Sequence, residues 1–407
     1  MDEQTKRFLK MKFRSHFEQN PVRMPPSYLQ REWAFIRFDP LPEVIMTRHR
    51  AFASSEDVRR YMTAAAPMHS YYSAAYYDSP SARRMVDKEW LGADLIFDLD
   101  ADHLPGAKHT YSDMLAHVKN ETIKLLDFLT DDFGIAESSI ELVFSGGRGY
   151  HFHIYDEKIR ELDSAQRREI VNYISGRGIN AKYFLKKEAM VGDTGAGTKE
   201  FNGKKHVPVK YGIRDVRSGW GKRIAVYMTD YLRTEAAKDD KEMFSDLRIN
   251  MNAGPASIRK LKEIGQSEEA LSDIENKGRL EFFRMFEFSD FFSYVVDRTV
   301  SRLGVDFGAS VDEPVTGDIH RLIRLPGSLH GGSGFEVKTI PVSHLPDFDP
   351  LTEAVAFSDR PTAITVSRPF SFEIGGNEYD VTEGPAELPE YAAVYLMCRG
   401  VANYGTR

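Results

Sequence analysis

Apolar residues near the N-terminus recur at the spacing of an α-helix. Leu9, Phe13 and Phe17 lie four positions apart, so they form one apolar stripe on a helix that we predict over residues 2–17. Pro21 cannot continue this helix because it lacks a backbone N–H donor. We therefore expect one face of the helix to pack on a core and the helix to end before this proline.

Shorter apolar runs follow that have the length of strands. We predict strands at residues 33–38 and 44–46, and a central, buried strand at 93–99, where the apolar run is nearly continuous. Asp98 and Asp100 close this third run. Because successive side chains of a strand alternate between its faces, these two carboxylates should leave the same face. Two acids placed this way attract a cation.

A helix and a hairpin are expected next. Thr110 and Asp113 have the spacing of a capping box, and apolar residues recur at helical spacing through 115–129. The runs 140–144 and 150–155 are apolar or aromatic and flank a glycine-rich turn, which is typical of two antiparallel strands. The helix should cover the sheet that these strands form.

The composition and pattern of the sequence change in its middle third. Residues 160–306 are rich in charge and mostly helical in pattern, and strand and turn signals return afterwards. We therefore expect a first part of one domain at residues 1–175, a mostly helical inserted subdomain at 176–308, and the completing part of the first domain at 309–407.

Composition limits the classes of protein that remain. The 407 residues include 54 Lys and Arg against 61 Asp and Glu, a net charge of −7, so any nucleic-acid-binding surface must be local. One cysteine, Cys398, excludes an internal disulfide. No segment approaches the roughly 20 apolar residues that span a bilayer, and no signal peptide is evident. We expect no membrane association and a cytoplasmic location.

Two further groups of residues complement the aspartates. The turn Ser145–Gly149 exposes backbone N–H groups beside Arg148 and His151, which together suit a polyphosphate. Arg324 and His330 lie in a second glycine-rich segment and supply similar donors. Each group also has a plain structural interpretation, as a strand end, a hairpin or a basic surface loop. Together they favour metal-dependent nucleotide chemistry.

At this point the chain resembles a known family, the small, catalytic subunit of archaeal and eukaryotic DNA primase. The resemblance covers most of the chain, and the order and spacing of its motifs both match. The matching segments are Arg31–Phe35 with Arg48, Phe97–Asp100, Ser145–His151, Asp312–His330 and, as an archaeal-looking end, Glu390–Met397.

Carried over position by position, the resemblance implies an active site. Asp98, Asp100 and Asp312 would be catalytic and hold two divalent ions, Mg²⁺ or Mn²⁺. An arginine near the active centre is matched by Arg48. The residues that would bind the phosphates of the incoming nucleotide are Ser145, Arg148, His151, Arg324 and His330.

The resemblance also implies a fold and partners. The fold would be α+β, a mixed-sheet primase domain of two lobes with an inserted helical subdomain. The activity would be synthesis of short RNA primers, with DNA primers left open, on a single-stranded DNA template from nucleoside triphosphates. The partner would be a primase large subunit that carries an iron–sulfur cluster. Many relatives have a cysteine-rich zinc knuckle after the paired aspartates, but residues 101–120 contain no cysteine, so we expect no structural zinc.

Three alternatives remain open. An aspartate-nucleophile phosphohydrolase also places Asp-x-Asp after an apolar strand, although Asp102 here occupies the place where that class expects Thr or Val. A repair-type primase-polymerase would use the same kind of active-site residues. A non-catalytic scaffold that binds nucleic acid is the alternative outside enzymes, and the presence of all three acids argues against it.

Overall fold

The computed structural model describes residues 1–101, 110–189, 199–201, 204–206, 209–251, 253–280, 288–306 and 314–405. The chain forms two compact units. The first contains Met1–Leu125, Ile135–Val171 and Asp306–Arg407, and the second contains Leu126–Gly134 and Asn172–Val305. Within the described ranges, no helix is both long and apolar enough to cross a membrane. The architecture is mixed α/β, with several antiparallel sheets.

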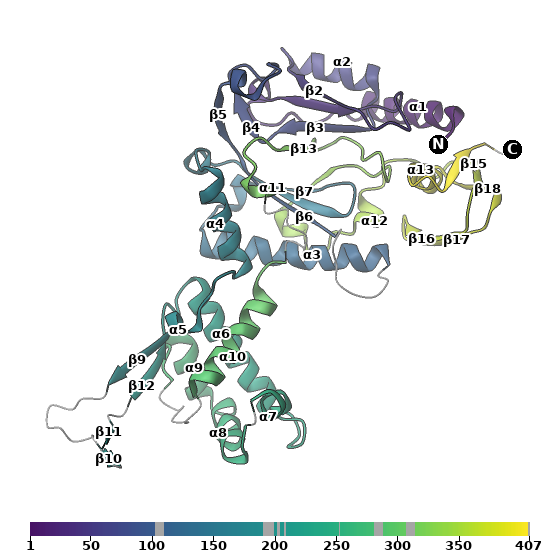
Figure 1. Ribbon diagram of the computed structural model, residues 1–407. Helices are drawn as coiled ribbons and strands as arrows, with labels where there is room; N and C mark the ends of the chain where they lie inside the picture. The colour runs from purple at the N-terminus through teal and green to yellow at the C-terminus, as the bar shows by residue number, and fades with distance from the viewer. Residues whose placement is uncertain are drawn as a thin grey trace. The chain divides into compact units, whose positions relative to one another are not determined.

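Two four-stranded antiparallel sheets form the centre of the first unit (Figure 1). The first sheet has the order β13-β3-β1-β2, and the second has the order β14-β7-β8-β6. In the first sheet the strands are β13 (Leu322–Arg324), β3 (His69–Ser73), β1 (Trp33–Ile36) and β2 (Met46–Arg50). In the second they are β14 (Lys338–Ile340), β7 (Ile140–Phe144), β8 (Gly149–Ile154) and β6 (Leu95–Asp100).

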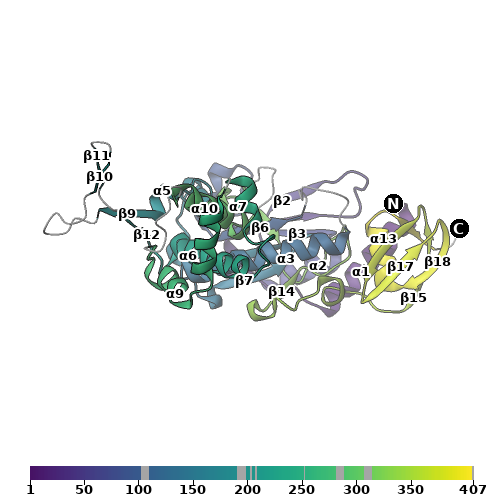
Figure 2. The ribbon, with the colours of Figure 1, turned by 90° about the horizontal axis from the view of Figure 1, so that it is seen from below.

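Helices and smaller sheets complete this unit. The helix α3 runs along the side of the second sheet that faces away from the first sheet (Figures 1 and 2). The helices are α1 (Glu3–Gln19), α2 (Ser55–Ala65), α3 (Tyr111–Asp127), α4 (Ser164–Ser175), α11 (Pro314–Gly317), α12 (Pro350–Glu353) and α13 (Glu390–Cys398). Both α3 and α4 end in the second unit. The remaining strands are β4 (Ala75–Tyr77), β5 (Trp90–Ala93), β15 (Pro361–Val366), β16 (Phe370–Ile374), β17 (Asn377–Val381), β18 (Gly384–Pro389) and β19 (Ala402–Tyr404).

The N-terminal helix packs against the C-terminal strands. Asp2 is its N-cap and accepts a hydrogen bond from the Thr5 N–H at 2.8 Å. The stripe predicted from the sequence, which includes Leu9 and Phe13, is buried. On the same helix, Phe8 stacks on Tyr404 with ring centres 3.9 Å apart, and Figure 2 shows the helix beside the yellow C-terminal sheet. Helix α1 and strand β19 are therefore neighbours, although they are far apart in the sequence.

Two strand predictions need correction. The apolar run that ends at Asp98 was expected at the centre of its sheet, but β6 is the edge strand of the second sheet. It is apolar because Leu95–Phe97 are buried, and an apolar run indicates burial rather than strand order. The strand predicted at 44–46 instead begins at Met46, and Val44 and Ile45 are exposed. Their β-branched side chains gain no burial that would fix a strand there.

The second unit is mostly helical. Its helices are α5 (Ala181–Phe184), α6 (Gly219–Ala236), α7 (Ser245–Asn250), α8 (Pro255–Gly265), α9 (Glu268–Lys277) and α10 (Phe288–Leu303). Two strand pairs accompany them, namely β9 (Leu185–Ala189) with β12 (Val209–Ile213) and β10 (Lys199–Phe201) with β11 (Lys204–His206). The buried Trp220 donates its indole N–H to the Tyr173 carbonyl at 2.8 Å and packs on Phe128. This contact explains why Leu126–Gly134 belong to this unit.

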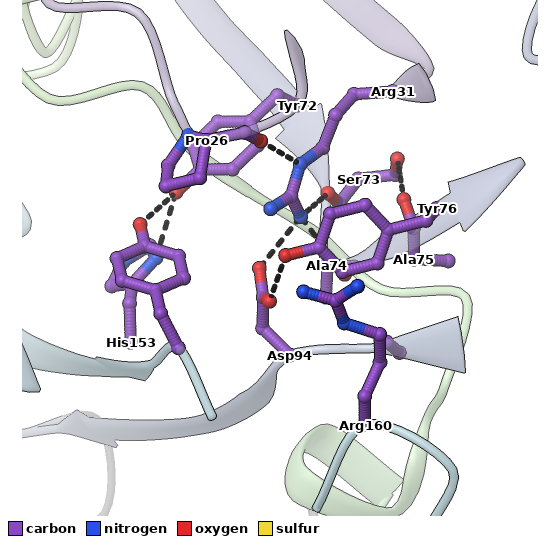
Figure 3. A network of polar contacts seen from close by, with 12 residues as sticks. Pro26, Arg31, Tyr72, Ser73, Ala74, Ala75, Tyr76, Asp94, His153 and Arg160 are labelled. Atoms are coloured by element: carbon purple, nitrogen blue, oxygen red, sulfur yellow. Dashed lines mark hydrogen bonds and ion pairs between the residues drawn. The ribbon is translucent and has the colours of Figure 1, made fainter. Parts of the chain in front are cut away.

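A buried ion pair joins the starts of β1 and β6 (Figure 3). Arg31 Nη1 lies 2.6 Å from Asp94 Oδ2, and both side chains are buried. Tyr76 donates its hydroxyl to Asp94 Oδ1 at 2.5 Å. The same Nη1 donates to the carbonyls of Ser73 and Ala74 at 2.9 Å. Because the charges are paired and hydrogen-bonded, they can remain away from water.

Tyr72 links the two sheets beside this ion pair. Its hydroxyl on β3 lies 2.7 Å from His153 Nδ1 on β8 (Figure 3). Burial, together with the nearby charges of His151 and Arg31, lowers the pKa of His153 well below its ordinary value, so the ring is neutral. His153 is a core residue, as the sequence predicted. The hydrogen bond fixes how the first sheet lies on the second.

We predict that Asp94→Asn destabilises the first unit. The substitution leaves the Arg31 charge buried without an anionic partner, which costs about 3–5 kcal/mol. The measurement is the free energy of unfolding in urea. The control is Glu56→Gln, which breaks a pair with Arg59 in which both side chains are exposed, and which should cost less than about 1 kcal/mol. Equal losses in the two variants would contradict the prediction.

Candidate active site

A cavity of about 520 Å³ opens between the two four-stranded sheets of the first unit. Its walls are formed by β6, β8 and β13, by two glycine-rich turns, and by the residue after α13. The lining residues are Tyr71, Asp98, Asp100, Ser145, Gly147, Arg148, His151, Arg321, Leu322, Ile323, Arg324, His330, Gly332, Ser333 and Arg399.

The carboxylates at the end of β6 lie beside a histidine and two arginines. His151 Nε2 lies 3.3 Å from Asp98 Oδ1, and Arg321 Nη2 lies 3.3 Å from Asp98 Oδ2. Burial alone would raise the pKa of Asp98, but His151 and Arg321 outweigh it and hold this pKa below its ordinary value. Arg148 Nε lies 3.8 Å from Asp100 Oδ1. Asp98 is therefore ionised, and both carboxylates line the cavity.

The first glycine turn is held by its own serine. Ser145 Oγ accepts hydrogen bonds from the N–H groups of Gly147 at 3.3 Å and Gly149 at 3.2 Å. Gly149 lies opposite Asp100 in the β6–β8 pair, and a Cβ there would lie 2.0 Å from the Leu99 carbonyl oxygen. Only glycine allows the two backbones to approach this closely. The close approach brings the turn against the carboxylates.

The second glycine turn is bonded to the first. Ser333 Oγ donates to the Gly146 carbonyl at 2.5 Å, and the Gly332 N–H donates to His330 Nδ1 at 3.2 Å. Gly146 has φ +74°, and a Cβ there would lie 2.6 Å from the His330 Cβ. Burial, followed by the charge of Arg324, lowers the pKa of His330 well below its ordinary value. His330 is therefore neutral, with Nε2–H as its donor.

Arg324 is held by neighbours on β3. Its Nη1 donates to His69 Nδ1 at 2.7 Å, and its guanidinium lies 5.2 Å from the ring centre of Tyr71. Burial, followed by the charge of Arg324, lowers the pKa of His69 to about 3. His69 is thus a neutral acceptor, which orients Arg324 without cancelling its charge. The arginine remains a cation on the cavity wall.

Comparison with known proteins gives a consistent result. A family model described as DNA primase small subunit matches residues 97–340. The DNA primase small subunits of Methanosarcina acetivorans and Methanosarcina barkeri are each 52% identical to this chain, over 100% of it and 98% of the relative. That of Methanococcoides burtonii is 48% identical over 100% of both chains. This chain belongs to the DNA primase small subunit family. The resemblance inferred from the motifs is confirmed.

Most of the site residues expected in this member of the primase small subunit family lie together. The cavity brings together Asp98, Asp100, Ser145, Arg148, His151, Arg324 and His330. Asp312 lies outside the described residues. Arg48 is not among the lining residues, because its Nε lies 3.1 Å from Oε1 of the buried Glu32.

Sequence reasoning missed four residues of the site. Arg321 belongs to the same short segment as Arg324, and its charge was the available signal. His69 and Tyr71 lie in a strand without a motif, and Arg399 follows a helix of mostly apolar residues. Nothing local in the sequence marks these three, because their roles come from contacts with distant segments.

The described part of the primase fold contains no group of three His, Cys, Asp or Glu side chains placed to hold a metal ion. Two of the three carboxylates that the motifs single out, Asp98 and Asp100, lie within it. Asp98 and Asp100 are two residues apart on β6, and both line the cavity. The donor chemistry suits a hard divalent cation, which prefers carboxylate oxygens.

We predict that Gly149→Ala destabilises the primase fold by roughly 2–3 kcal/mol. The new methyl group would meet the Leu99 carbonyl oxygen, so β6 and β8 would have to separate. The measurement is the free energy of unfolding in urea. As a control, Gly254→Ala places its methyl group where no atom lies within 4 Å, and should cost under about 1 kcal/mol. A Gly149→Ala protein as stable as this control would refute the steric argument.

Proposed function

We propose that this chain is the catalytic subunit of a DNA primase, which synthesises short RNA primers, or DNA primers, on single-stranded DNA by two-metal nucleotidyl transfer. The observation that carries the proposal is the cavity itself. It combines two carboxylates at a strand end with four arginines and two histidines from four segments of the chain. Its family membership supports the same activity.

The carboxylates fit the divalent ions that this reaction needs. Asp98 and Asp100 offer oxygen ligands on one strand, and Arg321 occupies the position of a counter-cation to Asp98. We propose that Asp312 completes this set, as the family motif implies. Bound Mg²⁺ or Mn²⁺ would favour the ionised 3′-hydroxyl and neutralise charge on the phosphates.

The remaining side chains bind and orient the nucleoside triphosphate. Arg148 and Arg324 present planar guanidinium groups that bind phosphate oxygens in pairs. His330 offers its Nε2–H as a neutral donor, and Ser145 can donate its O–H because its oxygen already accepts two N–H groups. His151 holds Asp98 in place. The triphosphate would then lie with its α-phosphate at the carboxylates, in line for attack by the hydroxyl.

A partner subunit follows from the same proposal. The relatives are named as small subunits, which supports a large subunit that acts with this chain. We propose that the large subunit carries an iron–sulfur cluster and helps to place the first nucleotides. Such a cluster needs several thiolate ligands, and this chain has the single Cys398.

We predict that Asp100→Asn abolishes primer synthesis, with a loss of at least about a hundredfold. The substitution removes a negative ligand from the metal site but keeps the side-chain shape. Labelled products are measured on single-stranded DNA with Mg²⁺ or Mn²⁺, with the chain alone and with its large subunit. Asp359→Asn, at an exposed position away from the cavity, is the control. A folded wild-type complex that binds template but forms no phosphodiester bond would favour the scaffold alternative.

We also predict that Mn²⁺ binds at the carboxylates in the presence of a nucleoside triphosphate. Electron paramagnetic resonance of free Mn²⁺ should report two bound ions per wild-type chain. Asp98→Asn should lower that number, because each ion depends on the paired carboxylates of β6. Unchanged stoichiometry in Asp98→Asn would place the metals elsewhere.

A further inference from the structure

Arg399 lines the cavity from a segment that carries none of the sequence motifs. It directly follows α13 and caps that helix, with its backbone N–H donating to the Tyr395 carbonyl at 3.0 Å. Its side chain reaches the cavity that contains Asp98 and His330. A fourth arginine therefore joins Arg148, Arg321 and Arg324 from a distant part of the sequence.

Two tyrosines hold the Arg399 guanidinium in place. Its central carbon lies 4.8 Å from the ring centre of Tyr111 and 5.0 Å from that of Tyr395. The Tyr111 hydroxyl donates to the Gly147 carbonyl, so the same support contacts the first glycine turn. The Arg399 side chain is also hydrogen-bonded to that of Tyr395, so the guanidinium is held by both rings and keeps its remaining N–H groups for other acceptors.

The hydrogen-bonding capacity of Arg399 is not used up by the described residues. Its Nε is buried and has no hydrogen-bond partner among them. No described carboxylate forms an ion pair with Arg399, whereas Arg321 pairs with Asp98 and Arg148 lies near Asp100. The side chain as a whole is only partly buried and lines the cavity, so its other N–H groups are available to an anionic ligand there.

The position of Arg399 within the cavity identifies which part of a ligand it meets. Asp98 is contacted by His151 and Arg321, whereas Arg399 is supported by the residue that holds Gly147. The charge of Arg399 also contributes, after burial and the charge of Arg324, to the lowered pKa of His330. Arg399 therefore lies near both glycine turns, beside the tyrosine that holds Gly147 and close enough to His330 to act on its pKa.

We propose that Arg399 binds the β- and γ-phosphates of the incoming nucleoside triphosphate and makes the cavity prefer a triphosphate over a monophosphate. This inference rests on the proposed function, in which the α-phosphate lies at the carboxylates. The two terminal phosphates then extend toward the glycine turns and carry most of the negative charge. A guanidinium held in place by two tyrosines, with N–H groups left over, suits them because it forms charge-assisted hydrogen bonds to phosphate oxygens.

The test is the affinity of the full chain for ATP and for AMP, measured by isothermal titration calorimetry with Mg²⁺. Arg399→Gln should raise the dissociation constant for ATP about tenfold, the size of one charge-assisted contact, and change that for AMP by less than roughly twofold. Arg399→Lys should fall between, because lysine keeps the charge but not the planar fork. Arg368→Gln, at an exposed position in the same C-terminal region, should match the wild type.

The outcomes separate this inference from the proposed function. The inference is overturned if Arg399→Gln binds ATP like the wild type, or if its affinities for ATP and for AMP fall by the same factor. Thermal melting by circular dichroism shows whether the variants are folded, and Arg399→Lys tests the inference if Arg399→Gln is not. If the wild type discriminates through Arg399 but makes no primers, the proposed function fails, and Arg399 is still shown to bind the terminal phosphates of ATP. A wild type that does not bind ATP overturns both.

Discussion

The buried ion pair between Arg31 and Asp94 is the interaction on which the cavity depends. It joins the segment that enters β1 to the segment that enters β6, so one charge pair fixes both sheets at their starts. The carboxylates lie at the other end of β6, and Arg324 lies on β13 of the first sheet. The way in which the two sheets are held together therefore sets the distance between the carboxylates and this arginine. Charges buried in this way are specific because each tolerates few alternative partners.

The electrostatics of the cavity follow from burial as much as from charge. His69 and His330 carry lowered pKa values because they are buried beside Arg324, and both remain neutral. As neutral groups they direct hydrogen bonds without adding to the positive charge of the wall. The arginines supply the charge, and Asp98 and Asp100 supply the opposite charge at one end. An anionic ligand that also brings a divalent cation would complement both ends.

Local sequence patterns indicated the elements better than their arrangement. The helical stripe of Leu9 and Phe13, the antiparallel pair around the glycine turn and the buried His153 are all found in the structure. The position of β6 at a sheet edge was not expected, because hydrophobicity reports burial and not strand order. Of the nine site residues expected from the family motifs, seven line one cavity. Asp312 lies outside the described residues, and Arg48, which pairs with Glu32, is not among the lining residues.

The sequence by itself determined the family, the carboxylate pair on one strand and the two glycine turns, because each of these depends on residues close together along the chain. Only the tertiary structure decided that Arg399 lines the cavity, and that Tyr111 and His69 hold Arg399 and Arg324 there. These residues are separated from the motifs by long stretches of chain, and their side chains are placed by packing between segments. A single sequence carries no local signal for such contacts, so they become visible only when the two sheets and the C-terminal helix are seen together.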